Sequence, residues 1–375
     1  MMDKNEHSNI EENSESALHV LKGITSSHDG FTSSQKKRFQ KKEETLPDVY
    51  ELAGKVRAGE RKDLAKAITF IESNLNSHYT YGQELLQQLL PYTGESIRIG
   101  VTGVPGAGKS TFIEVLGYML CENGLKTAVM AIDPSSSISG GSILGDKTRM
   151  EELAKHPNAF IRPSPSGGTL GGVHRKTRET MLLCEAAGFQ VILIETVGVG
   201  QGEFTVRSMV DFFLLMTLTG AGDDLQGIKK GIMELADAIV VNKADGENKQ
   251  LAEKTKREFN QILRMIQPAT RGWETKAFTC SAIQKEGINE LWGVIQEFEG
   301  KMKESGMFEE RRRLQTKEWL HTLIMEQLKM NFYNHSYVMT HLDDMETKAM
   351  SGEITPAQAV SDLFTNVYRH KEPFE

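Results

Sequence analysis

Few cysteines, no long hydrophobic run and no excess of positive charge occur in this sequence, and each absence excludes a class of protein. The 375 residues include three cysteines, Cys121, Cys184 and Cys280, which lie far apart along the chain. Sparse cysteines are typical of a reducing compartment, and this spacing provides neither a disulfide framework nor a CxxC zinc site. With 44 Lys and Arg residues against 51 Asp and Glu, the formal net charge is −7, which argues against nonspecific nucleic-acid binding.

Membrane-spanning and export signals are absent as well. The most apolar stretch, residues 209–218, contains Asp211 and is too short to cross a bilayer. The first residues are polar and acidic, which excludes a secretory signal and disfavours an Arg-rich transit peptide. We therefore expect a cytoplasmic protein that binds neither membranes nor nucleic acid.

Composition and periodicity predict four segments. Residues 1–45 are rich in Ser, Asn, Glu and Lys and are expected to form a polar, poorly ordered tail. In residues 46–94, apolar residues recur at helical spacing, which predicts a helical N-terminal extension. Residues 95–302 alternate apolar strand-like runs with helical stretches and form the expected catalytic domain. Residues 303–375 are expected to form a helical C-terminal arm that either packs back on the sheet or forms an oligomer interface, and we favour the interface.

The alternation in the catalytic domain predicts an α/β fold, with a mostly parallel sheet flanked by helices on both faces. The expected strands lie at residues 97–102, 127–132, 191–196, 212–218, 238–241 and 277–280. The expected helices between them lie at residues 109–122, 177–187, 224–235 and 250–266. In the arm, Leu320, Ile324 and Leu328 form an apolar stripe, and Thr355 with Gln358 forms a capping signal for a final helix.

The strongest local signal is a phosphate-binding loop that follows the first expected strand. Gly103 to Ser110 match G-x-x-x-x-G-K-[ST], and a helix is expected to follow. The glycines allow backbone amides to approach phosphate oxygens, and the helix N-terminus adds partial positive charge. We expect Lys109 to contact the β- and γ-phosphates and Ser110 to bind Mg²⁺. The residues assigned to nucleotide binding here are Gly103, Gly106, Ala107, Gly108, Lys109, Ser110 and Thr111.

A second motif selects the nucleotide base. Asn242, Lys243 and Asp245 form N-K-x-D directly after an expected strand. A carboxylate at Asp245 accepts two hydrogen bonds from guanine, whereas adenine presents the opposite polarity, so the motif favours GTP over ATP. After the next strand, Ser281 and Ala282 provide a backbone segment expected to meet the guanine O6 atom.

Carboxylates that follow strands are candidates for the magnesium site and for hydrolysis. Asp133 ends the second strand, Asp146 lies in a Gly/Ser-rich segment, and Glu195 begins E-T-V-G, a D-x-x-G switch pattern with Glu for Asp. We expect these three carboxylates and Ser110 to surround Mg²⁺, with Lys109, Glu195 and Asp146 as the catalytic residues.

Two further loops have the composition of switches. In Ras-like GTPases a Gln directly follows the D-x-x-G glycine, whereas here Val199 follows and Gln201 comes two residues later. We infer slow intrinsic hydrolysis that a partner raises by ordering the loops. The loop at residues 220–230 combines glycines with charges of both signs and is expected to change with nucleotide state through its charged side chains, Asp223, Asp224 and Lys229.

Taken together, these motifs resemble the MeaB-type GTPases, for which an older label is arginine/ornithine transport-system ATPase or kinase (ArgK). The resemblance rests on GVTGVPGAGKST, AIDPSSSISGGSILGDKTRM, ETVGVGQGE, GAGDDLQGIKKGIMELAD and VNKAD, which lie within residues 60–300. It implies a P-loop fold of the SIMIBI class, which includes the nickel-inserting GTPases and the signal-recognition particle.

The resemblance also implies the function. The family's members are metallochaperones that gate cobalamin loading and protect or reactivate adenosylcobalamin-dependent methylmalonyl-CoA mutase. It implies that Asp223 and Lys229 lie in the loop that signals to the mutase, that the C-terminal arm forms a homodimer, and that the adenosyltransferase is a further candidate partner. The client is expected to be an acyl-CoA mutase, with related mutases as alternatives to methylmalonyl-CoA mutase.

Three other functions compete with this interpretation. A nickel-insertion GTPase would need thiol or imidazole ligands, and the scattered cysteines without a His-rich tract count against it. A kinase or transport ATPase would prefer ATP, contrary to the N-K-x-D motif. A GTP-binding regulatory module with little hydrolysis remains open because Glu195 replaces Asp and no Gln adjoins Gly198.

Overall fold

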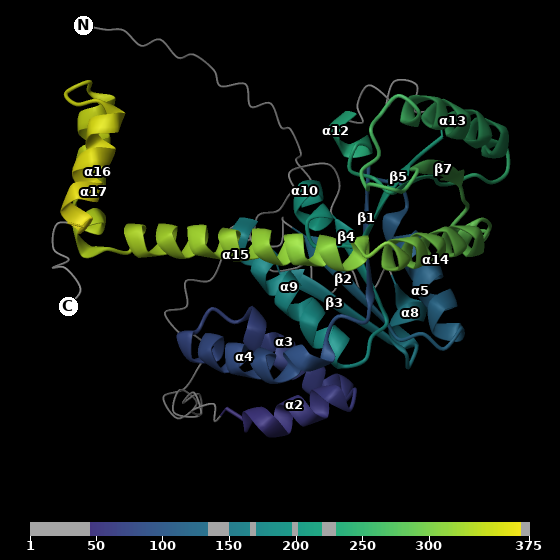
Figure 1. Cartoon of the computed structure of the whole chain (residues 1–375), viewed down its shortest axis with the longest axis horizontal. Coiled ribbons are helices and arrows are strands. Elements are labelled where there is room, and N and C mark those ends of the chain that lie inside the picture. The colour runs from purple at the N-terminus through teal and green to yellow at the C-terminus, as the bar shows by residue number, and fades with distance from the viewer. Residues whose placement is uncertain (1–45, 134–149, 166–169, 197–201, 220–229, 369–375) are drawn as a thin grey trace, which may run out of the picture. The chain divides into compact units, whose positions relative to one another are not determined.

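A computed structural model describes the chain over residues 46–133, 150–165, 170–196, 202–219 and 230–368. Within the compact unit Asp48–Glu375, a seven-stranded parallel sheet has the order β3-β2-β4-β1-β5-β6-β7 and lies between layers of helices (Figure 1). The strands are β1 (Ile97–Gly103), β2 (Thr127–Asp133), β3 (Ala159–Pro165), β4 (Val191–Thr196), β5 (Phe212–Thr217), β6 (Ala238–Val241) and β7 (Lys276–Thr279). The α/β fold predicted from the sequence is confirmed.

The six expected strands are present, with bounds that differ by at most one residue at either end. The prediction missed β3, which contains Pro163 and Pro165 and therefore lacks the pattern of a central strand. Proline is tolerated there because β3 is an edge strand and pairs with β2 alone among the described strands.

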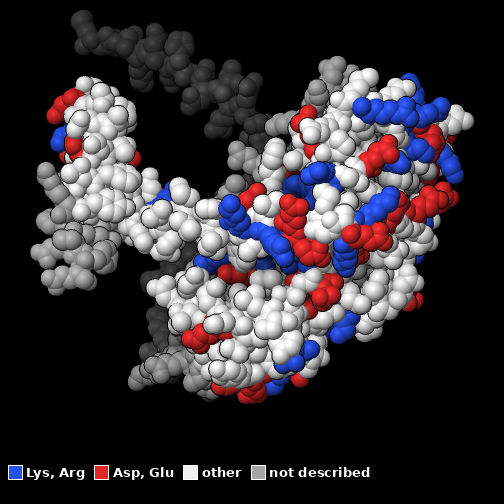
Figure 2. Space-filling model, viewed as in Figure 1, with Lys and Arg blue, Asp and Glu red and all other residues white. Residues whose placement is uncertain are grey.

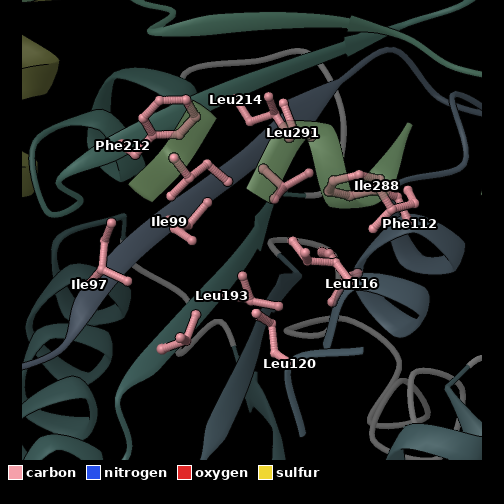
Figure 3. Packing of buried hydrophobic residues seen from close by; sticks show 14 of the residues in the cluster. Ile97, Ile99, Phe112, Leu116, Leu120, Leu193, Phe212, Leu214, Ile288 and Leu291 are labelled. Carbon is pink, nitrogen blue, oxygen red and sulfur yellow. The ribbon is translucent and has the colours of Figure 1, made fainter. Parts of the chain in front are cut away.

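One face of the sheet packs against α5 (Lys109–Glu122) and α14 (Ile288–Glu304). Figure 3 shows Phe112 and Leu116 of α5 and Leu291 of α14 lying over Ile99 and Leu214 of the central strands. Alternate strand residues point to this face, as expected for strands that are buried on both sides.

The opposite face packs against α9 (Leu170–Ala186), α10 (Gly202–Arg207) and the N-terminal helices. Three helices form this extension, α2 (Val49–Arg57), α3 (Arg61–Glu72) and α4 (Asn76–Leu89), followed by a short 3-10 turn, η2 (Leu90–Tyr92). They share one hydrophobic core with α9 and with alternate residues of β2 and β4.

The remaining helices complete the described fold. α8 (Glu151–Lys155) precedes β3, α12 (Lys230–Met233) precedes β6, and α13 (Asn248–Leu263) packs beside β6 and β7. Only the last part of the helix expected at 224–235 falls within the described residues. The helix expected from Thr177 begins earlier, at Leu170.

The C-terminal arm consists of α15 (Met307–Tyr333), α16 (Ser336–Met350) and α17 (Pro356–Tyr368). The expected cap of α17 is present, because the Gln358 amide donates to Thr355 Oγ1 at 3.1 Å. The reciprocal half is absent: the Gln358 side chain donates to Asp362 instead. No helix of the described segments is both long enough and apolar enough to cross a membrane.

Candidate functional site

The phosphate-binding loop connects β1 to α5. Gly108 at the start of α5 has φ of 84°, a left-handed conformation that other residues rarely adopt, and a Cβ there would lie 2.6 Å from Asn242 Nδ2. Gly103 has φ of 148°, and a Cβ on it would clash with the Met216 carbonyl of β5. Because glycine has no side chain to cap the helix, the first amides of α5 stay available for a phosphate.

Lys109 lies at the centre of this loop and is 8% exposed. Its ammonium donates to the Gly103 carbonyl at 2.9 Å and to the Val104 carbonyl at 3.3 Å. Within the described part of the chain, its third N–H remains for a phosphate oxygen. Burial lowers the pKa of Lys109, whereas the charges of Glu195 and Glu203 oppose that shift. The surroundings thus favour an incoming anion.

The structure brings two of the proposed magnesium ligands together. The Ser110 hydroxyl of α5 donates to Glu195 Oε1 at 2.7 Å, and Glu195 ends β4 next to β1. Hydroxyl and carboxylate oxygens are ligands that suit Mg²⁺, so this pair fits the ion. The backbone of Asp133 ends β2, the neighbour of β4, at the same edge of the sheet.

The proposed guanine site lies where β6 and β7 end. Asn242 links three loops: its Nδ2 donates to the Ala107 carbonyl at 2.8 Å, and its Oδ1 accepts from the Ala282 amide at 3.2 Å. Lys243 has φ of 59°, an uncommon conformation for a residue with a side chain. The Ser281 hydroxyl donates to Asp245 Oδ2 at 2.5 Å, which holds that carboxylate in place.

A small cavity joins the two halves of the site. It is lined by Gly108, Thr111, Asn242, Lys243, Asp245, Ala282 and Ile283. Six of these residues were assigned to nucleotide binding from the sequence, and the cavity adds Ile283, whose side chain is 76% exposed. The loops after β1, β6 and β7 therefore meet around one space, at the carboxyl edge of the parallel sheet.

Several predicted residues lie outside the described residues. These are Asp146, Gln201, Asp223, Asp224 and Lys229. Their catalytic, magnesium and switch roles therefore stay predictions.

One further acidic residue was missed by the sequence analysis. Glu203 is the second residue of α10, is 0% exposed, and acts electrostatically on Lys109. Its signal in the sequence was weak: it ends the E-T-V-G-V-G-Q-G-E segment, eight positions beyond Glu195, but no motif assigned it a role. Only the packing of α10 against β1 brings Glu203 near the phosphate-binding loop.

A parallel sheet with this loop after β1 and N-K-x-D after β6 defines a P-loop GTPase. The family model for "Methylmalonyl Co-A mutase-associated GTPase MeaB" matches residues 64–336. The chain therefore belongs to the MeaB family, and it is a GTPase that binds guanine nucleotide.

The names of individual relatives agree with this family assignment. The chain is 50% identical over 312 residues to a probable GTPase of Mycobacterium tuberculosis, covering 83% of this chain and 93% of the relative. It is 47% identical over 289 residues to GTPase ArgK of Escherichia coli, covering 77% and 86%. It is 44% identical over 323 residues to the mouse mitochondrial methylmalonic aciduria type A homolog, covering 84% and 78%.

A solved structure shows the same fold. The crystal structure of a LAO/AO transport system kinase superposes with a TM-score of 0.70 at 36% identity, covering 86% of this chain and 99% of that chain. The word kinase in that name describes the relative, whereas the N-K-x-D motif of this chain indicates guanine nucleotide.

Proposed function

We propose that this GTPase is a chaperone for an adenosylcobalamin-dependent acyl-CoA mutase, with methylmalonyl-CoA mutase as the client. The observation that carries the proposal is the match of residues 64–336 to a family described as associated with that mutase. In this proposal the GTPase gates cobalamin loading and protects or reactivates the mutase, and the adenosyltransferase is a further candidate partner.

In the proposed reaction, water attacks the γ-phosphate of GTP and the β–γ bond breaks to give GDP and phosphate. The amides at the start of α5 and the Lys109 ammonium hold the phosphates and stabilise the negative charge that develops on them. Mg²⁺ bound by Ser110, Asp133, Asp146 and Glu195 would neutralise charge on the β- and γ-phosphate oxygens. Glu195 orients the attacking water, and Asp245 with Ser281 selects guanine.

Signalling to the client follows from a difference between the GTP and GDP states. Gln201, Asp223, Asp224 and Lys229 are proposed to take different positions in the two states. A mutase that contacts one arrangement better than the other shifts the equilibrium between them, and it changes the hydrolysis rate because the two arrangements position the catalytic groups differently. We therefore expect slow turnover alone and faster turnover with the mutase.

Dimerisation through the C-terminal arm is part of the proposal. Leu320, Ile324 and Leu328 of α15 are 56%, 44% and 51% exposed. Figure 2 shows few charges on the visible face of the outer half of α15, whereas acidic and basic side chains alternate over the catalytic domain. An apolar stripe of this kind is typical of a helix covered by another subunit.

The test is hydrolysis by the purified full-length protein with GTP, with ATP as control, with and without the mutase. GTP-specific turnover that rises when methylmalonyl-CoA mutase is added supports the proposal. Turnover that is unaffected by this mutase or by a related acyl-CoA mutase contradicts the chaperone role and leaves the GTPase in place. The control is bovine serum albumin at equal concentration, which should change nothing.

A further inference from the structure

Helix α10 lies between the proposed nucleotide site and the base of the C-terminal arm. Its second residue, Glu203, is fully buried and acts on Lys109 through its charge. Its last residue, Arg207, lies one turn further on, near the start of β5 and β6. The helix has six residues, so it spans about 9 Å.

The middle of α10 is packed tightly against the central strand. Val206 is 1% exposed, and a Cβ on Gly100 of β1 would lie 2.8 Å from Val206 Cγ1. The same strand ends in the phosphate-binding loop. Because protein interiors resist compression, a shift at one end of α10 is transmitted along the helix instead of being absorbed by loose packing.

The C-terminal end of α10 is held by a buried carboxylate. Arg207 Nη1 lies 3.3 Å from Asp237 Oδ2, and Arg207 Nη2 donates to Thr270 Oγ1 at 3.1 Å. Asp237 is 0% exposed and also accepts from the Phe213 amide of β5 at 2.9 Å. Asp237 directly precedes β6 and accepts from the Phe213 amide of β5, so the Arg207 side chain is tied to the sheet itself.

The first turns of α15 use the same partners. Arg311 Nη1 lies 3.9 Å from Asp237 Oδ2, and Arg311 Nη2 donates to Thr270 Oγ1. One turn later, Gln315 Nε2 donates to the Val210 carbonyl at 2.8 Å, in the segment that connects α10 to β5. Two helices distant in sequence therefore share one carboxylate and one hydroxyl.

We propose that Arg207 is a positioning residue for GTP hydrolysis, which holds α10 against β1, the strand that ends in the phosphate-binding loop, and that Arg311 links this position to the arm. The inference rests on the proposed phosphate site at Lys109. The guanidinium groups of Arg207 and Arg311 compete for Asp237. Movement of α15 therefore changes the contact between Arg207 of α10 and Asp237. The arm and the nucleotide site are coupled through this cluster.

The test measures kcat and KM for GTP on full-length variants. Arg207→Gln is expected to lower kcat about 10-fold with KM within about two-fold, since Arg207 contacts no nucleotide. Arg207→Lys keeps the charge and should restore most of kcat. The matched control is Arg313→Gln, an exposed arginine on α15, which should behave as wild type. Circular dichroism shows whether Arg207→Gln folds. If it does not, Arg207→Lys is tested instead, provided that it melts at the wild-type temperature, and it should show a smaller decrease in kcat.

A double-mutant cycle tests the link to the arm. Arg311→Gln and Arg207→Gln are combined, and their effects on kcat should be non-additive because both act through Asp237. Losses that multiply would overturn the coupling, and wild-type kcat in folded Arg207→Gln would overturn the positioning role. Lys109→Ala separates the two levels of the proposal. Normal hydrolysis in that variant contradicts the proposed site, whereas loss there with normal Arg207→Gln contradicts only this inference.

Discussion

Lys109 keeps a positive charge in a place where little water reaches it. Its ammonium is held by two carbonyl oxygens of the phosphate-binding loop, at 2.9 and 3.3 Å, and by the fields of Glu195 and Glu203. A buried cation of this kind gains most when an anion arrives, because most of its own desolvation has already taken place. The residue is therefore organised to stabilise charge on the transferred phosphate.

We expect Lys109→Ala to lower kcat for GTP hydrolysis by about 100-fold or more, because one charge-stabilising donor is lost. Single-turnover hydrolysis of labelled GTP measures the change. Lys155→Ala is the control, since Lys155 lies on α8 with a 70% exposed side chain. Near-normal turnover in Lys109→Ala would contradict the assignment of this loop.

Asp245→Asn should change which base is bound. The carboxylate is held by Ser281 at 2.5 Å and lines the small cavity beside Asn242. Asparagine offers one donor where guanine needs an acceptor, so GTP affinity should fall about 100-fold while xanthosine triphosphate gains. Competition binding with the two nucleotides measures this, with Glu258→Gln on α13 as control. An unchanged preference for GTP would refute the proposed base site.

The edge of the sheet at β7 is protected by one helix side chain. Asn260 of α13 accepts from the Ala277 amide at 2.9 Å and donates to the Ala277 carbonyl at 3.4 Å, in the place of a neighbouring strand. An uncovered edge strand invites pairing with another chain. One amide side chain therefore satisfies the backbone where the sheet ends.

Asn260→Ala should leave both groups of Ala277 without this partner. We expect a loss of about 1–3 kcal/mol in the free energy of unfolding and faster aggregation on heating. Urea denaturation and light scattering measure the two effects. Asn260→Asp keeps the acceptor and should lose less, and the neighbouring Gln261→Ala should lose little. Equal stability of Asn260→Ala and wild type would contradict the protective role.

The apolar stripe on helix α15 is the basis of the dimer proposal. Replacing Leu320 and Leu328 with Glu puts charges where an apolar surface is expected to be covered by another subunit. The double variant should sediment as a monomer in sedimentation velocity. The melting temperature of its catalytic domain should stay close to that of the wild type. Lys329→Gln, also exposed on α15, is the control. A dimer that survives the two charges would place the interface elsewhere.

Across the whole molecule, a buried ion-pair network joins the amino ends of the central strands to α15. Glu185 of α9 accepts from Arg98 Nε at 2.8 Å, from the Ser96 hydroxyl at 2.5 Å and from the Gly94 amide at 2.9 Å. Arg312 of α15 reaches the same region and donates to Asp211 Oδ2 at 2.7 Å. The arm is therefore anchored opposite the nucleotide edge of the sheet.

This network makes stability depend on pH. Burial would raise the pKa of Glu185, but the Arg98 guanidinium, the Ser96 hydroxyl and the Arg312 charge outweigh it and hold the pKa below its usual value of 4.5. The folded state thus binds a proton less readily than the unfolded state. The stabilisation is complete above the unfolded pKa and is lost as pH falls through the lowered folded pKa.

Urea unfolding between pH 3 and 7 tests this, and the free energy of unfolding should fall on the acid side. Glu185→Gln should be about 3 kcal/mol less stable at pH 7, since Arg98 is left unpaired, and its stability should vary less with pH. Glu122→Gln, whose side chain is 58% exposed, is the control. An equal slope in the two variants would contradict the role of Glu185.

Part of the molecule was predictable because its signals are local. The strands of the central sheet are continuous apolar runs, and β1 with α5 encloses a loop whose glycines are required by its own backbone. The prediction missed β3, where two prolines obscure the strand pattern.

The sequence by itself determined the class of reaction and the nucleotide. Each of the two motifs, the P-loop and N-K-x-D, is a short continuous segment that directly follows a strand, so a local pattern is enough to identify it. Tertiary structure decided which distant residues meet. Ser110 contacts Glu195 across 85 positions, and Asn242 contacts Ala107 across 135, because strand order brings the ends of β1, β4 and β6 to one edge. The link from Arg207 through Asp237 to Arg311 likewise depends on how α10 and α15 pack, which no local pattern encodes.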